Sequence, residues 1–352
     1  PNFKMQQVEA WSLSVQQQVQ NNLIVELNYS GTSAHHLLEF NNDINRWAGD
    51  LIQNNGKFTR LNHNFAGTAW GNSDGNSAGN YGSLAVIRTL THGLSLRGIY
   101  TYGKVLDEVS YAQSLDSGSV TATTDVIQSN NLKAQRGRAD FDIRNQFTAD
   151  GTWDVPNHYS SLVLRNILGG WQFGGKWVGY TGLPFTVRTT QSFIPTCSGG
   201  AAPVGSGCPA ESTITGVASN SGDYNADGYN YDVPNVPSFG KHLSGQSKSQ
   251  FLTGIFKASQ FPVPSLGVEG SLGRNTYDAP GYKDFDFTFE KYFNVPWFFA
   301  EKMKIEAKGE VFNLFNRTNL NGVDSNMVDS SFGRSTSQLP SRSLQLHLRA
   351  SF

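Results

Sequence analysis

The chain has 352 residues, a formal net charge of −1 and only 16% charged residues. This length accommodates two domains or one large barrel. Because the charge balance provides no basic field, we expect no nucleic-acid partner. No apolar run approaches the roughly 18 residues of a membrane-spanning helix, and the first residues lack the basic start and apolar core of a signal peptide. If the protein is exported, we therefore expect its true beginning to lie upstream.

Alternation of apolar and polar residues predicts nine β-strands, because successive side chains of a strand point to opposite faces. The expected strands lie at 11–15, 23–29, 84–90, 94–102, 146–155, 171–187, 284–293, 303–311 and 344–352. Polar residues at 20–22 and 91–93 predict tight turns after the first and third strands.

The stretch 284–310 shows this alternation most clearly. Its first half places phenylalanines at 285, 287, 289 and 293 on one face, where Lys291 is the only charge. Its second half alternates small or apolar residues with charged residues of both signs. A helix would spread the apolar residues around its surface and would place like charges four residues apart, where they repel. We therefore expect a hairpin with one aromatic face and one charged face.

Every second connection between the expected strands is a long polar segment. Residues 31–79, 104–141, 188–282 and 316–340 are expected loops, and the third has room for an extra hairpin near 251–261. Because short and long connections alternate, every long loop falls on one rim of the sheet. This layout is typical of an outer-membrane barrel with long extracellular loops. A soluble sandwich with one charged face in water is the alternative.

The charged residues at 304–310 indicate which face of such a barrel would be outside. A Lys or Arg at mid-bilayer costs roughly 2–4 kcal/mol, so charges on the lipid side would remove much of the stability. We therefore expect the following residues to face the lumen and to pair across the wall: Lys304, Glu306, Lys308 and Glu310. Nine antiparallel strands cannot close, so the chain is expected to be the C-terminal part of a longer barrel.

Aromatic residues gather near both expected rims. Such girdles mark the two membrane–water boundaries of a barrel. The expected members near the short turns are Trp153, Trp171, Phe293, Trp297 and Phe352. The expected members near the long loops are Trp11, Tyr29, Tyr100, Tyr102 and Tyr180.

One segment of the third loop is similar to a calcium-binding loop. Asp223, Asn225 and Asp227 supply oxygen ligands at positions 1, 3 and 5, and glycine follows at position 6. Position 12 is Pro234, although Asp232 could replace the missing carboxylate. The candidate cofactor is therefore Ca²⁺, and the alternative is a turn rich in Asp and Asn.

The same loop contains both cysteines of the chain, Cys197 and Cys208. A disulfide would form between them in an oxidising compartment, and two free thiols are the alternative.

No pattern predicts catalysis. Residues 75–79 match the glycine-serine-glycine pattern of a nucleophile elbow, but neither the preceding strand nor the following helix is present, so we expect a flexible loop. The histidines show no metal-ligand spacing. We assign no catalytic residue and expect no enzyme.

Several motifs together resemble the TonB-dependent outer-membrane receptors, specifically the Oar-like group. They are the strand entry at Trp11, RGRADFDIR at 136–144, GGWQ at 169–172, GRN at 273–275, PGY at 280–282, VFNLFN at 311–316 and FGR at 332–334. The resemblance covers nearly the whole chain and implies a bacterial outer-membrane location. It also implies that residues 1–352 are the C-terminal portion, about 9–11 strands, of a 22-stranded barrel whose plug and N-terminal domain are absent here.

The resemblance further implies energised uptake of a bulky ligand of the carbohydrate or peptide class. A TonB-type energy-transducing protein would act through the missing plug, and the long loops at 31–79, 104–141 and 188–282 would contact the ligand. Phe352, at the end of an alternating strand, is similar to the signal that the barrel-insertion machinery recognises, and ordinary girdle packing is the alternative. The alternative functions are a non-transporting structural or adhesive barrel and a soluble carbohydrate-binding sandwich.

Overall fold

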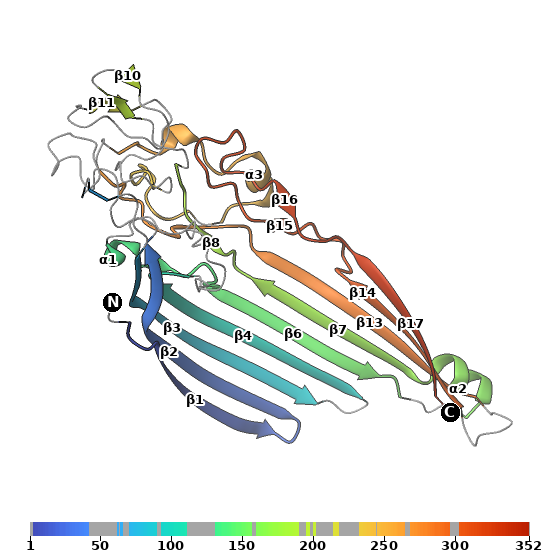
Figure 1. Ribbon diagram of the computed structural model, residues 1–352. Helices are drawn as coiled ribbons and strands as arrows, with labels where there is room; N and C mark the ends of the chain where they lie inside the picture. Colours follow the sequence, from blue (N-terminus) through green and yellow to red (C-terminus); the bar gives the residue numbers. More distant parts are fainter. Residues whose placement is uncertain are drawn as a thin grey trace.

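The computed structural model describes residues 3–41, 62, 64–65, 70–89, 93–110, 131–156, 160–189, 195–197, 200–201, 214–217, 232–243, 245–264, 268–295 and 303–351. Nine long antiparallel strands form one curved sheet in which each strand pairs with its neighbours in sequence (Figure 1). They are β1 Gln7–Gln20, β2 Leu23–Asn41, β3 Trp70–Thr89, β4 Leu94–Asp107, β6 Asn145–Asp154, β7 Trp171–Tyr180, β13 Tyr282–Val295, β14 Met303–Phe312 and β17 Ser343–Ser351. The nine predicted strands are confirmed, and β5 Gly137–Arg138 extends the sheet at the end of β4.

The connections alternate in length as predicted. A two-residue turn joins β1 to β2, and short connections also follow β3 and β13. The four long connections follow β2, β4, β7 and β14, and their described parts gather at the upper end of the sheet in Figure 1. Long loops therefore occupy one rim, and the shorter connections occupy the other, including residues 155–170 between β6 and β7, which contain a helix.

The two faces of the sheet differ in chemistry. One face, called the aromatic face, carries Phe147, Phe173, Trp177 and Phe287 from three adjacent strands. The opposite face, called the polar face, carries the charged residues of β14. Within the described ranges no second sheet packs on the aromatic face, whereas the soluble sandwich alternative requires one.

The prediction that residues 31–79 form a loop is wrong for both ends of that segment. β2 continues to Asn41 and pairs with β3 from Trp70 onward. Beyond the row of Tyr29, Gly82 and Tyr102 the alternation stops: β3 consists mostly of Gly, Ser and Asn, and β2 has apolar residues at 37, 38 and 40 without a period of two. Where both faces meet water, backbone pairing no longer requires alternating hydrophobicity, so the sequence gives no strand signal. The nucleophile-elbow match at 75–79 lies inside β3, not in a loop.

Two further expectations about the long loops are corrected. The strand after Trp171 ends at Tyr180 and does not reach residue 187; β8 Pro184–Phe185 instead pairs with β12 Tyr277–Asp278. No hairpin forms at 251–261, where α3 Lys248–Thr253 and η2 Ala258–Gln260 lie. Ser247 and Gln250 form a capping box that starts α3, which favours a helix over a strand.

Short elements complete the described parts of the long loops. β9 Pro195–Cys197, β10 Gly200–Ala201 and β11 Ile214–Val217 form a small sheet, and β15 Leu320–Asn321 pairs with β16 Ser337–Gln338. The other helices are α1 Leu132–Gln135 and α2 Leu162–Leu168. Among the described helices, none combines the length and the apolar character needed to cross a membrane.

The long-loop rim carries a folded unit, which we call the cap. It consists of the described parts of residues 181–189, 232–281 and 314–342. These segments share a buried hydrophobic core formed by Val187, Val233, Phe256, Phe261, Leu272, Tyr277 and Phe332. Backbone hydrogen bonds link the segments, such as Ile255 N to Gly333 O at 2.9 Å. Much of the expected loop at 188–282 therefore has a core of its own.

The cap meets the sheet at Gly182, where two chain segments pass in close contact. A Cβ atom at Gly182 would clash with the backbone carbonyl of Ala279, which cannot rotate away. We predict that Gly182→Ala destabilises the protein by about 1–3 kcal/mol, the usual cost of overpacking. The measurement is the denaturant midpoint of the full-length protein in vesicles.

Gly82 provides the matched control, because nothing lies within 4 Å of the Cβ that an alanine would add there. Gly82→Ala should leave the midpoint unchanged or raise it slightly. Equal midpoints for the two variants would contradict the close approach at Gly182.

Candidate functional site: the cap, its anchoring network and the polar face

A buried group of ion pairs, which we call the arginine network, fixes the cap to the ends of β4 and β5. At its centre the Arg274 guanidinium pairs with the Asp107 carboxylate, and both side chains are at most 2% exposed. Arg274 also donates to Ser110 Oγ at 3.0 Å and to the backbone oxygen of Gln135 at 3.2 Å. A buried guanidinium needs such partners, because an unpaired buried charge is very costly.

The motif at 136–144 supplies the second half of the arginine network. Asp142 is fully buried and accepts hydrogen bonds from Val105 N and Arg138 Nε, both at 2.7 Å. Arg144 lies 3.1 Å from the same carboxylate, and Arg138 reaches Asp278 at 2.6 Å. Burial alone would lower the pKa of Arg138, but its hydrogen bonds to the two carboxylates outweigh burial and raise that pKa.

Asn275 connects the two halves of the arginine network. Its backbone has φ of 52°, in the left-handed region that asparagine tolerates better than most residues. In this conformation its amide nitrogen donates to Arg138 O at 2.7 Å, and its backbone N–H donates to Thr186 Oγ1 at 2.9 Å. The GRN motif at 273–275 and the motif at 136–144 therefore contact each other directly.

Tyr277 links the arginine network to the hydrophobic core of the cap. Its ring lies 4.8 Å from that of Phe256, and its hydroxyl donates to Gly240 O at 2.9 Å. Burial raises the pKa of Tyr277 to about 12. The hydroxyl therefore remains a protonated donor at any physiological pH.

Charged side chains form rows across the polar face. Arg97, Asp150, Lys176 and Asp286 are register partners on β4, β6, β7 and β13, with alternating sign. The first pair is an ion pair at 2.9 Å. Opposite charges on directly adjacent strands stabilise a sheet by roughly 0.2–1 kcal/mol per pair. The polar face is thus ionic but locally balanced.

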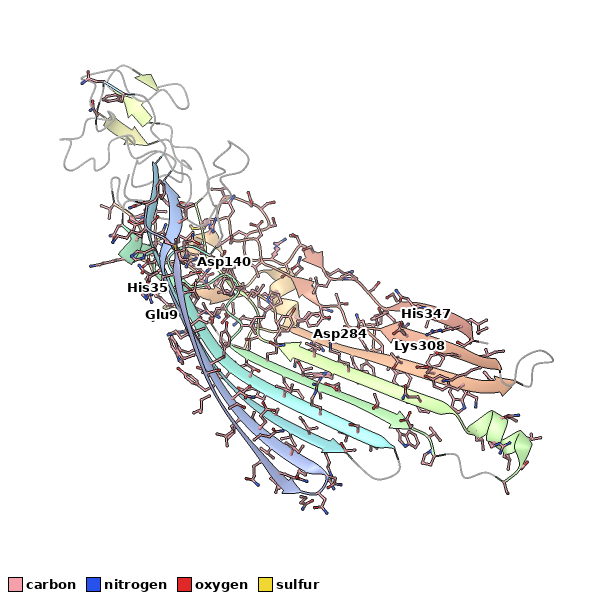
Figure 2. The ribbon with its side chains drawn as sticks, turned by 60° about the horizontal axis from the view of Figure 1, so that its bottom comes forward. Glu9, His35, Asp140, Asp284, Lys308 and His347 are labelled. Carbon is pink, nitrogen blue, oxygen red and sulfur yellow. The ribbon has the colours of Figure 1, made fainter. Side chains whose placement is uncertain are left out.

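The four charges predicted on 304–310 lie together on this polar face. Glu310 accepts contacts from Lys308 at 2.8 Å and from His347 at 3.0 Å. Lys308 and His347 extend side by side from β14 and β17 (Figure 2). Pairing across strands is therefore observed for Glu310, while its contact with Lys308 runs along the strand.

The other two predicted charges have different neighbours. Lys304 places its ammonium 3.9 Å from the centre of the Tyr292 ring, a cation–π contact. Glu306 lies between Tyr292 and Arg349 in the register.

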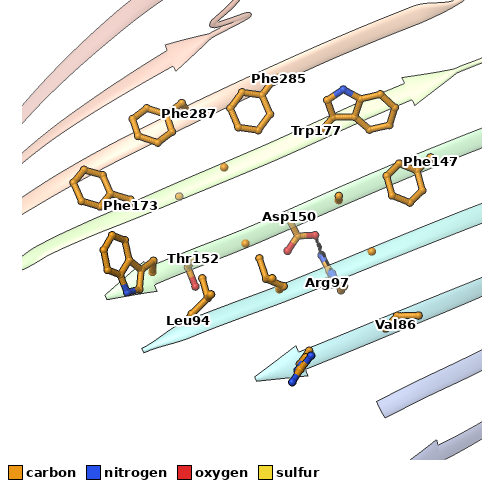
Figure 3. A pocket seen from close by; sticks show the side chains of 18 of the residues that line it. Val86, Leu94, Arg97, Phe147, Asp150, Thr152, Phe173, Trp177, Phe285 and Phe287 are labelled. Carbon is orange, nitrogen blue, oxygen red and sulfur yellow. Dashed lines mark hydrogen bonds and ion pairs between the residues drawn. The ribbon is translucent and has the colours of Figure 1, made fainter. Parts of the chain in front are cut away.

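A groove of about 760 Å³ crosses the aromatic face over β3, β4, β6, β7 and β13 (Figure 3). Gly98, Gly151 and Gly175 lie along its floor. Its aromatic lining consists of Tyr100, Phe147, Trp153, Phe173, Trp177, Phe285 and Phe287. This lining suits hydrocarbon, so a polar ligand is better sought on the cap and the polar face.

Comparison with known proteins identifies the family. The family model described as "Outer membrane beta barrel domain" matches residues 1–345. The chain belongs to this family. It is an all-β outer-membrane barrel protein of the bacterial outer membrane, its long loops are extracellular, and its barrel contacts membrane lipid.

Among solved structures, the chain is similar to the outer membrane transporter YddB from Escherichia coli, with 9% sequence identity and a TM-score of 0.47. The match covers 99% of this chain and 33% of that one, so the chain spans about a third of the length of YddB. No curated protein shows significant sequence similarity to the chain.

Several predicted site residues of this barrel protein remain predictions. Of the calcium set, Asp232 is fully buried and its backbone oxygen accepts from Thr189 N at 3.0 Å, whereas Asp223, Asn225 and Asp227 lie outside the described residues. Among the described side chains, no group of three His, Cys, Asp or Glu is placed to hold a metal ion.

The disulfide and the assembly signal are likewise untested. Cys197 ends β9, but the other predicted cysteine, Cys208, is not in a described range. Phe352 follows the last described residue, Ser351.

The arginine network was not predicted from the sequence. The motifs that supply it were recognised only as part of a resemblance, because their partners lie far apart in sequence: Arg274 and Asp107 are 167 residues apart. The available signal was a density of Arg and Asp at 136–144, which is unusual in a chain with only 16% charged residues.

We predict that Arg274→Met loosens the cap, because it leaves the Asp107 carboxylate buried without its main partner. Breaking a buried ion pair costs roughly 3–5 kcal/mol. The measurement is hydrogen exchange of the amides at 251–278 in the full-length protein in vesicles. In Arg274→Met, the free energy for local opening of the cap should fall by this amount.

Arg97→Met is the matched control, since its ion pair with Asp150 is half exposed, with side chains 50% and 35% accessible. It should change the same exchange by less than about 1 kcal/mol. Unchanged protection in Arg274→Met would show that the arginine network does not hold the cap.

Proposed function

We propose that this chain forms the C-terminal wall and extracellular cap of a TonB-dependent outer-membrane transporter for a bulky carbohydrate or peptide. The observation that carries the proposal is a folded, internally bonded cap at the extracellular rim of a wide ionic wall. A structural barrel needs neither a cap with its own core nor alternating charges along its inner face.

The polar face is proposed to line the lumen. The rows through Lys176 and Lys308 would otherwise place several ions against lipid, at roughly 2–4 kcal/mol for each Lys or Arg. The large exposed aromatic side chains on the other face would then meet hydrocarbon. This orientation gives Lys304, Glu306, Lys308 and Glu310 their predicted place in the lumen.

The open sheet supports a wide barrel. β1 and β17 are its two edges, and within the described residues neither pairs with a further strand on its outer side. Unpaired edges do not occur in the hydrocarbon region, so additional strands are proposed to complete the wall. Barrels with 16 or more strands enclose an aqueous channel, and those with 22 a plugged lumen. A plug and a TonB-type partner acting on it belong to this proposal.

The exposed side chains of β17 support the proposed insertion signal. Leu344, Leu346 and Leu348 alternate on the aromatic face and are among the most exposed apolar side chains of the sheet. An edge strand of this kind, followed in the sequence by Phe352, is what the barrel-insertion machinery is proposed to engage. No step of the proposed function needs a catalytic residue.

Uptake by cells tests the proposal. Cells that produce the full-length protein are given fluorescein-labelled maltoheptaose or a labelled decapeptide mixture, and periplasmic fluorescence is measured with and without a proton-gradient uncoupler. We expect uptake of at least one probe class that the uncoupler abolishes. Arg274→Met should lower uptake at limiting probe concentration by weakening the cap, while Gly82→Ala, which adds a methyl group where nothing lies within 4 Å, should leave it near the original level.

Two results would contradict the transport proposal. Uptake that persists with the uncoupler would indicate a passive pore. Surface binding of the probes without any periplasmic signal would indicate a non-transporting, adhesive barrel.

A further inference from the structure

The connection between β6 and β7 contains a short amphipathic helix at the short-turn rim, α2 Leu162–Leu168 (Figure 1). At about 100° per residue, positions 163, 164, 167 and 168, all apolar, fall within one arc of the helix, and Arg165 and Asn166 fall on the other side together with position 162, a leucine. The apolar face is open: Val163 is 65%, Leu164 47%, Ile167 60% and Leu168 43% exposed. A soluble surface rarely leaves four adjacent aliphatic side chains uncovered.

The C-terminal end of α2 is fixed to the aromatic face of the sheet. The indole nitrogen of Trp171 donates to Ile167 O at 2.9 Å. The Lys291 ammonium donates to Gly169 O, just past the helix end, and lies 3.5 Å from Ile167 O. Trp171 and Lys291 are register partners on β7 and β13, so both project from the same face of the sheet.

Lys291 is the one charge that the sequence places on the aromatic side of β13, and the contacts explain it. Lys291 is only 4% exposed, and its ammonium lies 5.2 Å from the ring centre of Trp171 and 5.3 Å from that of Phe293. A cation at a helix C-terminus is favoured because the last carbonyls carry partial negative charge. Lys291 therefore acts as a clamp that holds α2 against the aromatic face of the sheet.

We propose that α2 lies in the membrane interface of the inner leaflet, with its apolar face among phospholipid acyl chains and Arg165 at the headgroups. The helix is attached to the face that meets lipid, beside the aromatic rings of Trp171 and Phe293, so its apolar face continues the hydrophobic surface of the barrel. A helix with one apolar and one cationic or polar side lies in such an interface. This inference rests on the orientation proposed above, with the aromatic face toward lipid, and not on the proposal of transport.

The proposal predicts that the two sides of α2 differ in their surroundings. Spin labels are attached to Ile167→Cys and, as a matched control, to Asn166→Cys, both in a Cys197→Ser, Cys208→Ser background. The full-length protein is reconstituted in phosphatidylethanolamine and phosphatidylglycerol vesicles without any other protein. The label at 167 should collide at least fivefold more with oxygen than with a water-soluble nickel chelate, relative to the label at 166.

A second variant tests the clamp. Lys291→Met removes the ammonium but keeps the length and apolar character of the side chain, so the barrel should still form, as checked by its resistance to proteolysis. With the label at 167, this variant should show a more mobile spectrum and a smaller preference for oxygen.

Two outcomes would overturn the inference. Equal exposure of the labels at 166 and 167 to the nickel chelate would place α2 in water or against another protein in the cell. An unchanged spectrum at 167 in a folded Lys291→Met protein would show that Lys291 does not hold the helix at the membrane.

Discussion

The structure depends on one constraint: within the bilayer, every backbone polar group must be bonded inside the protein, and ionic side chains must avoid hydrocarbon. Nine long paired strands satisfy the first condition everywhere except at the two edges of the sheet. Alternation satisfies the second, because Lys308 and Glu310 fall on one face while Phe287 and Phe289 fall on the other. Lys291, on the aromatic face, is accommodated by the carbonyls at the end of α2.

Beyond the membrane a different interaction takes over. The cap is held together by an aromatic core and is attached to the sheet by the pair of Arg274 with Asp107 and by the contacts of Asp142. These charges are deeply buried, so they constrain the positions of the loops that carry them. A loop that shifted would leave a buried ion without its partner, which is costly. The buried partners therefore fix the position of the cap relative to the sheet.

The features that could be predicted from the sequence are those that the bilayer requires. The nine strands, their faces and the sorting of long loops to one rim follow from period-two alternation. The extension of β2 to Asn41 could not be predicted, because apolar and polar residues do not alternate after Tyr29. The pairing of Arg274 with Asp107 depends on segments that only the fold brings together, and α2 is too short for a periodic signal. The charges of β14 lie on one face, as predicted. Their pairing across strands was predicted in general, but the contact of Lys304 with the Tyr292 ring was not.

The assignment of the two faces can be measured along β13. Single cysteines at successive positions from 285 to 290, in the full-length cysteine-free protein in vesicles, are treated with a membrane-impermeant maleimide. The account predicts a period of two, with positions 286, 288 and 290 labelled rapidly and positions 285, 287 and 289 protected. Rapid labelling at the phenylalanine positions, or equal rates at all six, would contradict a wall with lipid on its aromatic face and water on its polar face.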